Sequence, residues 1–437
     1  MSRPRISVQP YLFQLRQSIV DLLPSRSLPL IDGRRWSDRI LVICAVLLSW
    51  SAGSTLIERF SAARDAVIKM YPSRKRPGRT YGGFMKMLMR RTQQLVGALT
   101  EALRKRMEQV ADSCWTMEGW LVFTADSSKL DCPMTPANEK EIGCASKAKS
   151  WPQMILATFV HLGCGLPWSW RLGKACSSER DLVTQMLDDL PPRSLVVADA
   201  GFIGCEFFKT LLACGHHLLI RVGANVHLIE KLGYAVKEHD GIVYLWPKDM
   251  QKLGRTPLVL RRITLVDGRN RRMVLLTSVL ETERLSDELA KEIYGRRWGI
   301  ELFYRTLKQT MGRGKLLSDC PQNAEIEGQW AMLGVLMLGL IMLQAKAPAA
   351  AVADQSIAQA LRAVRDAMGG RIRPGRRKLQ VVLRKAMRDR YVRLHSKRAR
   401  HWPHRKNPRP PGEPQARMAE PEEVQLAQRL SRRRAAA

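Results

Sequence analysis

The stretch GWLVFTADSSK, residues 119–129, decides the fold of this chain because it combines an apolar β-like run with a single acid, Asp126, at its end. The stretch RSLVVADAGFIG, residues 193–204, repeats the pattern with Asp199. Small residues follow each acid and leave room around the carboxylate. A lone Asp in this position is most often a turn or helix-cap residue. Two in matched contexts favour a shared chemical role.

The segments around these two runs indicate an α/β fold. Two further β-like runs lie between them, and a helix with a Ser/Glu start and a Pro stop precedes the second acid. A helix and another strand follow Asp199. The order β-β-β-α-β-α-β is the ground plan of a ribonuclease H-like sheet. In that sheet the strands of Asp126 and Asp199 are neighbours, so both carboxylates can reach one metal ion. Asp131 is a rival to Asp126 but falls later, in a Pro-bounded loop.

Residues 222–283 interrupt this plan with short β-like runs and turn signals, which predicts a β-rich insertion. Helical periodicity returns at Ser286. The apolar run from Trp330 to Ala345 is 16 residues long, short for a membrane span, and a buried core helix explains it better. We therefore expect a catalytic domain over residues 116–345.

Charge dominates the composition of the 437 residues. The net charge is +32 and the pI is about 10.4, which indicates a polyanionic partner, with nucleic acid first and an anionic membrane surface second. Residues 1–112 have apolar residues at helical spacing with basic residues between them. We expect a helical DNA-binding domain there, and an ordinary bundle with a solvated basic face is the alternative.

The C-terminal part is the most basic. Residues 371–410 hold sixteen Lys or Arg against one acid, Asp389. We expect a basic helical region over 346–395 and a disordered basic tail over 396–437, which either contacts phosphates non-specifically or only aids solubility. Nine cysteines at irregular spacing favour reduced thiols and a cytoplasmic location.

A lone acid among cations marks YGRRWGIELFYRTLK, residues 294–308. On a regular helix Tyr294, Arg297, Glu301 and Lys308 would fall within an arc of roughly 60°, with Arg305 on a nearby face. Simple ion pairing between residues four apart is the plain explanation. The combination with Asp126 and Asp199 raises a functional one.

The spacing Y-x2-R-x3-E-x6-K of this stretch resembles the YREK signature of the insertion-sequence-four family of bacterial DDE transposases. Asp126 in TADSS and Asp199 in VVADAGF look like the first and second acids of that family, and a β-rich insertion before the Glu is a family trait. The resemblance covers about residues 116–345.

This resemblance implies an enzyme that cleaves transposon ends and transfers strands into target DNA, with a possible hairpin intermediate. Asp126, Asp199 and Glu301 would bind two Mg²⁺ ions, for which Mn²⁺ can substitute. Tyr294, Arg297, Arg305 and Lys308 would hold phosphates of the terminal inverted repeats. The family also implies a homodimer in the DNA complex. Trp246 is a candidate platform for a flipped base, with a place in a small core as the alternative.

Three alternatives remain open at this point. The chain could be a DNA-binding protein derived from a transposase but catalytically inactive. It could be a ribonuclease H-like nuclease without strand transfer. A basic membrane-associated protein is the third, and it rests only on the run from Trp330 to Ala345.

Overall fold

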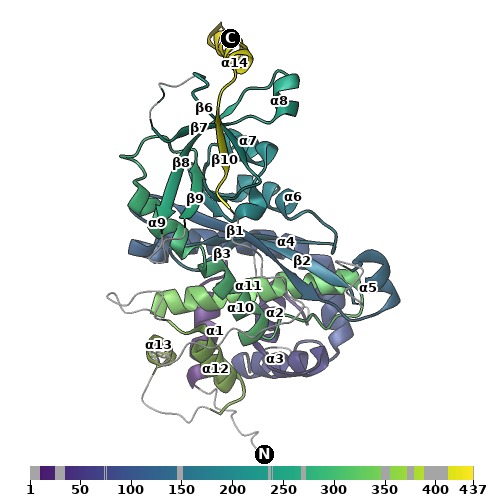
Figure 1. Cartoon of the computed structure of the whole chain (residues 1–437). Coiled ribbons are helices and arrows are strands. Elements are labelled where there is room, and N and C mark those ends of the chain that lie inside the picture. Colours follow the sequence, from purple (N-terminus) through teal and green to yellow (C-terminus); the bar gives the residue numbers. More distant parts are fainter. Residues whose placement is uncertain are drawn as a thin grey trace, which may run out of the picture. The chain divides into compact units, whose positions relative to one another are not determined.

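The computed structural model describes residues 10–24, 35–72, 74, 76–144, 151–234, 238, 240–266, 272–345, 355–371, 378–387 and 412–436. The chain divides into two compact units whose segments alternate along the sequence. Unit 1 comprises residues 1–116, 127–183 and 299–389, and unit 2 comprises residues 117–126, 184–298 and 390–437. Strand β1 (Val122–Asp131), labelled in Figure 1, contributes residues 122–126 to unit 2 and residues 127–131 to unit 1.

Unit 1 is mainly helical, as expected for the N-terminal part. Its helix α11 packs against α2 and α4 of the N-terminal segment and against α12 and α13. Unit 1 also contains the short elements η1 (Asp112–Cys114), α5 (Pro136–Glu141) and α6 (Glu179–Thr184), the last residue of which falls in unit 2. The main helices are α1 (Pro10–Val20), α2 (Asp38–Trp50), α3 (Leu56–Met70), α4 (Tyr81–Ala111), α10 (Gly299–Arg305), the π-helical turn η4 (Thr306–Thr310), α11 (Pro321–Ala345), α12 (Ile357–Met368) and α13 (Leu379–Arg384).

Helix α11 is the buried core helix that the sequence predicted. Among the described residues it alone is long and apolar enough to cross a membrane, and 89% of its most apolar window is buried in the protein. Helix α2 approaches it so closely at Gly334 that a Cβ there would lie 2.0 Å from Oγ of Ser49. The indole of Trp50 donates a hydrogen bond of 2.8 Å to the carbonyl of Gly334. Apolar contact and one buried hydrogen bond therefore join the two helices.

Unit 2 is built on a mixed sheet with the strand order β10-β6-β7-β8-β9-β5-β4-β1. Strands β1, β4 and β5 run parallel, and helix α7 connects β4 to β5. In unit 1 the second half of β1 continues into the order β1-β2-β3, with β2 and β3 antiparallel. The bounds are β2 (Gln153–His161), β3 (Leu166–Gly173), η2 (Leu187–Asp189), β4 (Leu195–Ala198), η3 (Ala200–Phe202), α7 (Cys205–Ala213) and β5 (His217–Val222). This mixed α/β architecture is consistent with the expected ribonuclease H-like plan.

The predicted β-rich insertion is present as an antiparallel extension of the unit 2 sheet. Strand β9 pairs with β5, and β8, β7 and β6 follow outward. The elements are β6 (His227–Glu230), β7 (Ile242–Leu245), α8 (Lys248–Lys252), β8 (Leu258–Val266), β9 (Arg272–Thr277) and the following helix α9 (Asp287–Arg296). Residues 267–271, which include the DG turn signal at 267–268, lie outside the described residues.

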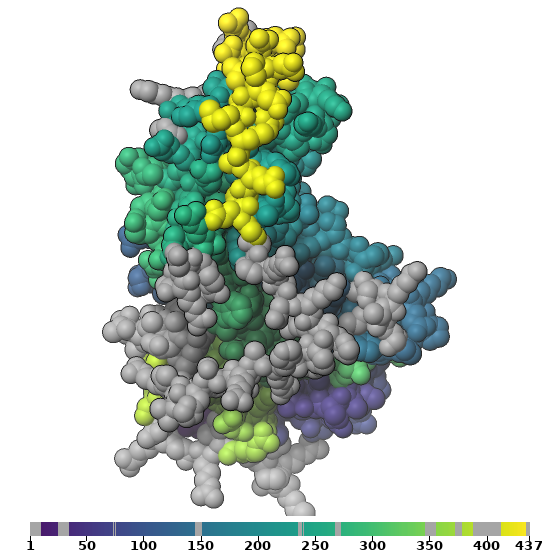
Figure 2. Space-filling view, viewed as in Figure 1, coloured from purple at the N-terminus to yellow at the C-terminus, as the bar shows by residue number. Residues whose placement is uncertain are grey.

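The expectation of a disordered tail is wrong for residues 412–436. Strand β10 (Gln415–Met418) pairs in parallel with β6, and helix α14 (Pro421–Ala436) follows it. Figure 2 shows this C-terminal segment lying on the surface of the insertion. Ala427 and Leu430 enter the apolar core of the insertion, so burial of a few apolar side chains orders the segment that follows the Pro- and Arg-rich run. The predicted tail residues 396–411 lie outside the described residues.

Candidate active site

Asp126 and Asp199 occupy matched positions on neighbouring parallel strands of unit 2. Strand β1 pairs with β4 in a register that sets Thr124 opposite Val197, so each acid lies two residues beyond this pair. Strand β5 continues the row, because Val197 is opposite Leu219 and Arg221 lies two residues further. Adjacent strands are about 4.8 Å apart, so two acids and one cation form a row across three strands.

The local backbone explains how the acids are held. Asp199 follows directly after β4 and caps η3, where its Oδ1 accepts a hydrogen bond of 2.8 Å from the amide of Gly201. A Cβ at position 201 would lie 2.9 Å from that same oxygen, so only glycine leaves it uncrowded. Strand β1 does not end on Asp126 as predicted but continues to Asp131. Asp126 therefore lies inside β1. By the register of the two strands it is level with Asp199, the first residue after the end of β4 at Ala198.

The rival acid Asp131 has a structural role. It is the last residue of β1 rather than part of a loop, and its Oδ1 accepts hydrogen bonds from the indole of Trp151 at 2.9 Å and from the amide of Gln153 at 2.5 Å. Its backbone also bridges to Lys315 and accepts from the amide of Leu316 at 2.8 Å. These bonds use the residue to join β1 to β2 and to the loop after η4.

Tyr294 and Arg297 belong to the same unit as the two acids. Burial raises the pKa of the Tyr294 phenol, the charge of Asp199 adds to this, and the charges of Arg297 and Arg221 oppose it. The guanidinium carbon of Arg297 is 5.8 Å from the ring centroid of Tyr294. The phenol therefore stays protonated, and it shares its surroundings with one acid and two cations. Arg221 was missed from the sequence, although a single Arg inside the apolar run HLLIRVG (217–223) is a usable signal.

The stretch 294–308 is not one continuous helix. Helix α9 ends at Arg296, Arg297 and Trp298 form a turn, and α10 begins at Gly299. The glycines at positions 295 and 299 lower the helical preference on both sides of this turn. The interpretation that four signature residues share one helical face is therefore wrong. Tyr294 and Arg297 lie in unit 2, whereas Glu301, Arg305 and Lys308 lie in unit 1.

In unit 1 these three residues differ in exposure. Glu301 lies in the first turn of α10 and is half-buried, and Arg305 is exposed at its end. Lys308 lies in the π-helical turn η4, a type of irregularity that is frequent at functional sites. Burial lowers the pKa of Lys308, and the charge of Asp131 partly offsets this.

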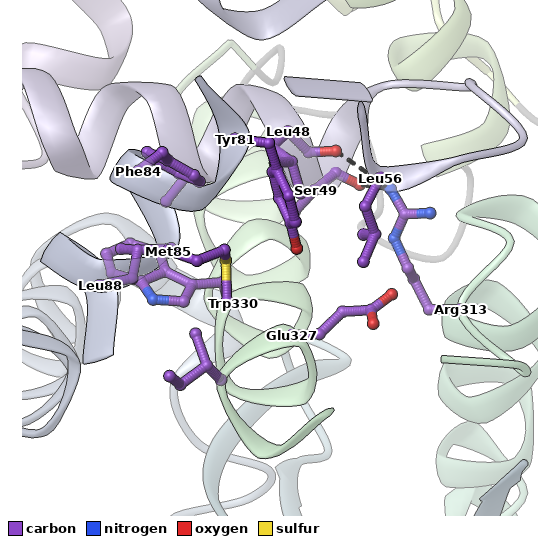
Figure 3. A pocket seen from close by; sticks show the side chains of 12 residues that line it. Leu48, Ser49, Leu56, Tyr81, Phe84, Met85, Leu88, Arg313, Glu327 and Trp330 are labelled. Carbon is purple, nitrogen blue, oxygen red and sulfur yellow. Dashed lines mark hydrogen bonds between the residues drawn. The ribbon is translucent and has the colours of Figure 1, made fainter. Parts of the chain in front are cut away.

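Buried charges fix the loop that follows Lys308. Nη2 of Arg313 donates to the carbonyls of Leu48 and Ser49 at the end of α2, at 3.2 and 2.6 Å (Figure 3). It also donates to the carbonyl of Ser51 at 3.1 Å. A cation at a helix C-terminus also complements the helix dipole. Oε2 of Glu327 accepts from the amides of residues 317 and 318 and from the hydroxyl of Ser318. The N-terminal helices thus anchor the loop between η4 and α11.

Trp246 and Trp298 are the two tryptophans considered for base stacking, and one is buried whereas the other is exposed. Trp246 is 3% exposed, packs in the core of the insertion, and donates an indole hydrogen bond of 2.7 Å to the carbonyl of Arg255. Its proposed role as a stacking platform is therefore wrong. Trp298 is 59% exposed, in the turn beside Arg297. Such exposure is unusual for a Trp side chain.

The two carboxylates that unit 2 contributes are suitable ligands for a divalent cation. Mg²⁺ prefers carboxylate oxygens and keeps several waters, and Asp126 with Asp199 presents two carboxylates in one row. Among the described residues, no group of three or more His, Cys, Asp or Glu side chains lies close enough to hold a metal ion. The chemistry of these two carboxylates therefore suits a metal ion, but the described residues do not form a complete set of metal ligands.

Comparison with known proteins gives three findings. Residues 121–338 match the family described as "Transposase DDE domain". The chain is 27% identical over 233 residues to "Transposase InsG for insertion sequence element IS4" of Escherichia coli (strain K12), a match that covers 49% of this chain and only about half (50%) of that relative. A solved cryo-EM structure of the piggyBac transposase synaptic complex with hairpin DNA is similar over 89% of this chain and 84% of that chain, at 11% identity and a TM-score of 0.38.

Proposed function

Residues 121–338 of this chain belong to the transposase DDE domain family, and on this premise we propose that the protein is a metal-dependent DNA transposase. It would cleave the ends of a transposon and transfer the freed strands into target DNA. The observation that carries the proposal is the matched pair Asp126 and Asp199 on neighbouring parallel strands. Two acids side by side on neighbouring strands can act together on a phosphodiester. Two unrelated turn residues would not be expected at matching positions of paired strands.

Each site residue has a role in this proposal. Asp126 and Asp199, with Glu301 as the third acid, would hold two Mg²⁺ or Mn²⁺ ions. Bound there, the ions would activate the attacking water or 3′-hydroxyl and stabilise the leaving oxygen. Arg297 would grip a phosphate by its planar fork, and the protonated phenol of Tyr294 would donate a hydrogen bond to a phosphate oxygen.

Further cations extend this grip on the DNA. Lys308 would act as a point charge on the phosphate backbone, and exposed Arg305 would add a weaker, screened contact. Arg221 lies next to Asp199 in the row and would draw the DNA strand toward the acids. If the reaction passes through a hairpin, exposed Trp298 rather than buried Trp246 offers the stacking surface for a flipped base.

The partners follow from the reaction. The substrate would be double-stranded DNA, both terminal inverted repeats and target, and the net charge of +32 supports binding to such a polyanion. Joining two ends in one event requires them to be held together, for which we propose a homodimer in the DNA complex. We further propose that the protein acts in the cytoplasm, where its nine free cysteines would stay reduced.

The test is DNA cleavage by purified protein on fragments that carry the inverted repeats flanking its own gene, with Mg²⁺ present. Wild-type protein should produce specific 3′-hydroxyl ends and joined products. Glu301→Gln should lose both while it keeps DNA binding. The matched control is Glu292→Gln. Glu292 is an exposed acid on α9 that forms a 2.7 Å ion pair with Arg296, which lies one helical turn after it.

The outcomes separate the alternatives. An inactive derivative would bind the repeats without cutting them. A nuclease without strand transfer would cut without joining. If Glu301→Gln cuts as well as the Glu292→Gln control, Glu301 is only an ion-pair residue and the three-acid assignment fails.

A further inference from the structure

A cavity of unit 1 lies among the N-terminal helices, where the end of α3 and the following loop meet α2. Its volume is about 70 Å³. Its inner wall is apolar, with Ile40 and Val67, and its other lining residues include Lys69, Tyr71, Arg74 and Arg76. A pocket of this size takes a small group with a few well-placed polar partners. The loop is the basic segment between α3 and α4 in the sequence.

Arginines surround the phenol of Tyr71 in this cavity. The guanidinium carbon of Arg16 lies 5.1 Å from the Tyr71 ring centroid and 4.2 Å from that of Phe13. Burial raises the pKa of Tyr71, while the charges of Arg16, Arg39 and Arg74 lower it. Arg16 therefore lies over the Tyr71 ring, Arg74 lines the same cavity as Tyr71, and the charge of Arg39 acts on the same phenol.

Two of these cations are held in place by hydrogen bonds within the protein. Arg16 donates a hydrogen bond of 2.9 Å to the carbonyl of Met70, and Arg74 donates one of 2.9 Å to the hydroxyl of Ser37. Within the described part of the chain, the buried Nε of Arg39 has no hydrogen-bond acceptor. The nearby acid Asp38 is engaged by Arg91, whose Nε donates to it at 3.1 Å. The cluster therefore keeps an excess of positive charge.

We propose that this cluster, the Tyr71 cage of Arg16, Arg39, Tyr71 and Arg74, binds a backbone phosphate of DNA outside the DDE domain. The inference rests on the proposed function for the identity of the polyanion. Arginine forks and a phenol donor match the oxygens of a phosphodiester, and pre-ordered side chains lower the entropy lost on binding. The N-terminal helices would thus hold the DNA at a second point, which positions it without reading its bases.

The test measures DNA affinity against salt for Arg39→Gln combined with Arg74→Gln. Loss of one phosphate contact should weaken binding about eightfold at 0.1 M salt and reduce the slope of log K against log salt by about 0.9. The control, Arg429→Gln with Arg432→Gln, removes two exposed charges from α14 and should leave the slope nearly unchanged. Arg39→Lys with Arg74→Lys keeps the charge and should recover most of the affinity, which separates charge loss from misfolding.

A second readout locates the contact. Ethylation of one backbone phosphate should weaken binding of the wild type and have no effect on the Gln variant. Wild-type affinity and slope in the Gln variant would overturn the inference while leaving cleavage, and so the proposed function, intact. Absence of DNA binding by the wild type would instead remove the proposed function. If inorganic phosphate raises the Tm of the wild type but not of the variant, and DNA affinity is equal, the cage takes free phosphate and the DNA assignment is wrong.

Discussion

The carboxylate of Glu423 is expected to hold the C-terminal strand and helix on the insertion. Its two oxygens accept hydrogen bonds from Arg417 at 2.8 and 2.6 Å, from the amide of Glu420 at 3.0 Å and from the side chain of Gln251 at 3.0 Å. One side chain therefore links β10, α14 and α8. Glu423→Gln removes the charge and keeps the volume.

The size of the effect follows from the pKa. Hydrogen bonding to Arg417 is the main cause that lowers the pKa of Glu423 from 4.5 to about 2. A shift of this size corresponds to about 3 kcal/mol, but Arg417 is 43% exposed and solvent screens the pair, so we expect about 1.5–2 kcal/mol. Because the folded pKa is depressed, this stability is present above pH 4.5 and is lost as the pH falls toward 2.

Amide hydrogen exchange measures the result directly. The amides of Gln415 and Ala419 bond to the carbonyls of Val226 and Glu230, each at 2.9 Å. In Glu423→Gln they should exchange about 10- to 30-fold faster than in the wild type, and the exposed Glu422→Gln serves as the control. Unchanged exchange in Glu423→Gln, or unprotected amides in the wild type, would refute the reasoning.

Three further predictions concern other parts of the chain. Trp246→Ala should destabilise the protein by about 3–5 kcal/mol, whereas Trp298→Ala should leave the Tm unchanged and slow the step that needs a flipped base; thermal unfolding and cleavage assays separate them. Burial lowers the pKa of His161 to about 4. The free energy of unfolding should therefore be highest above pH 6.5 and fall by about 3 kcal/mol by pH 4, because the unfolded state binds a proton that the buried ring does not. Denaturant titrations should find this pH dependence in the wild type and not in His161→Gln. Arg313→Met should cost about 3 kcal/mol in the same titrations because it uncaps α2, and an unchanged midpoint would show that its three hydrogen bonds contribute nothing.

The sequence predicted the elements whose signal is local. The apolar runs before Asp126 and Asp199 became β1 and β4, and parallel pairing followed from the order of elements. The core helix α11 was also predicted, because an apolar run too short for a membrane has to be buried in the protein. In each case hydrophobic burial, which sequence patterns report well, determined the structure.

The errors arose where the tertiary environment outweighs local pattern. Trp246 had two interpretations in the sequence, a stacking platform or a place in the core of the insertion, and the structure shows the second. Helix α14 was predicted to be disordered because it follows a Pro- and Arg-rich run, although a few apolar residues are enough to dock it. Arg221 became a site residue only through strand register, and the turn at Trp298 broke a pattern that had been treated as regular.

The central claim, that Asp199 binds the metal ion used to cut DNA, is most directly tested by Asp199→Cys. A thiolate is a poor ligand for Mg²⁺ and a better one for Mn²⁺, so the identity of the ion reports on the contact. Asp181→Cys, at an exposed acid on α6, is the control and should cut normally in both ions. We predict that Asp199→Cys binds the terminal repeats, fails to cut them with Mg²⁺, and regains measurable cleavage with Mn²⁺. Cleavage at the wild-type rate with Mg²⁺ would contradict the account.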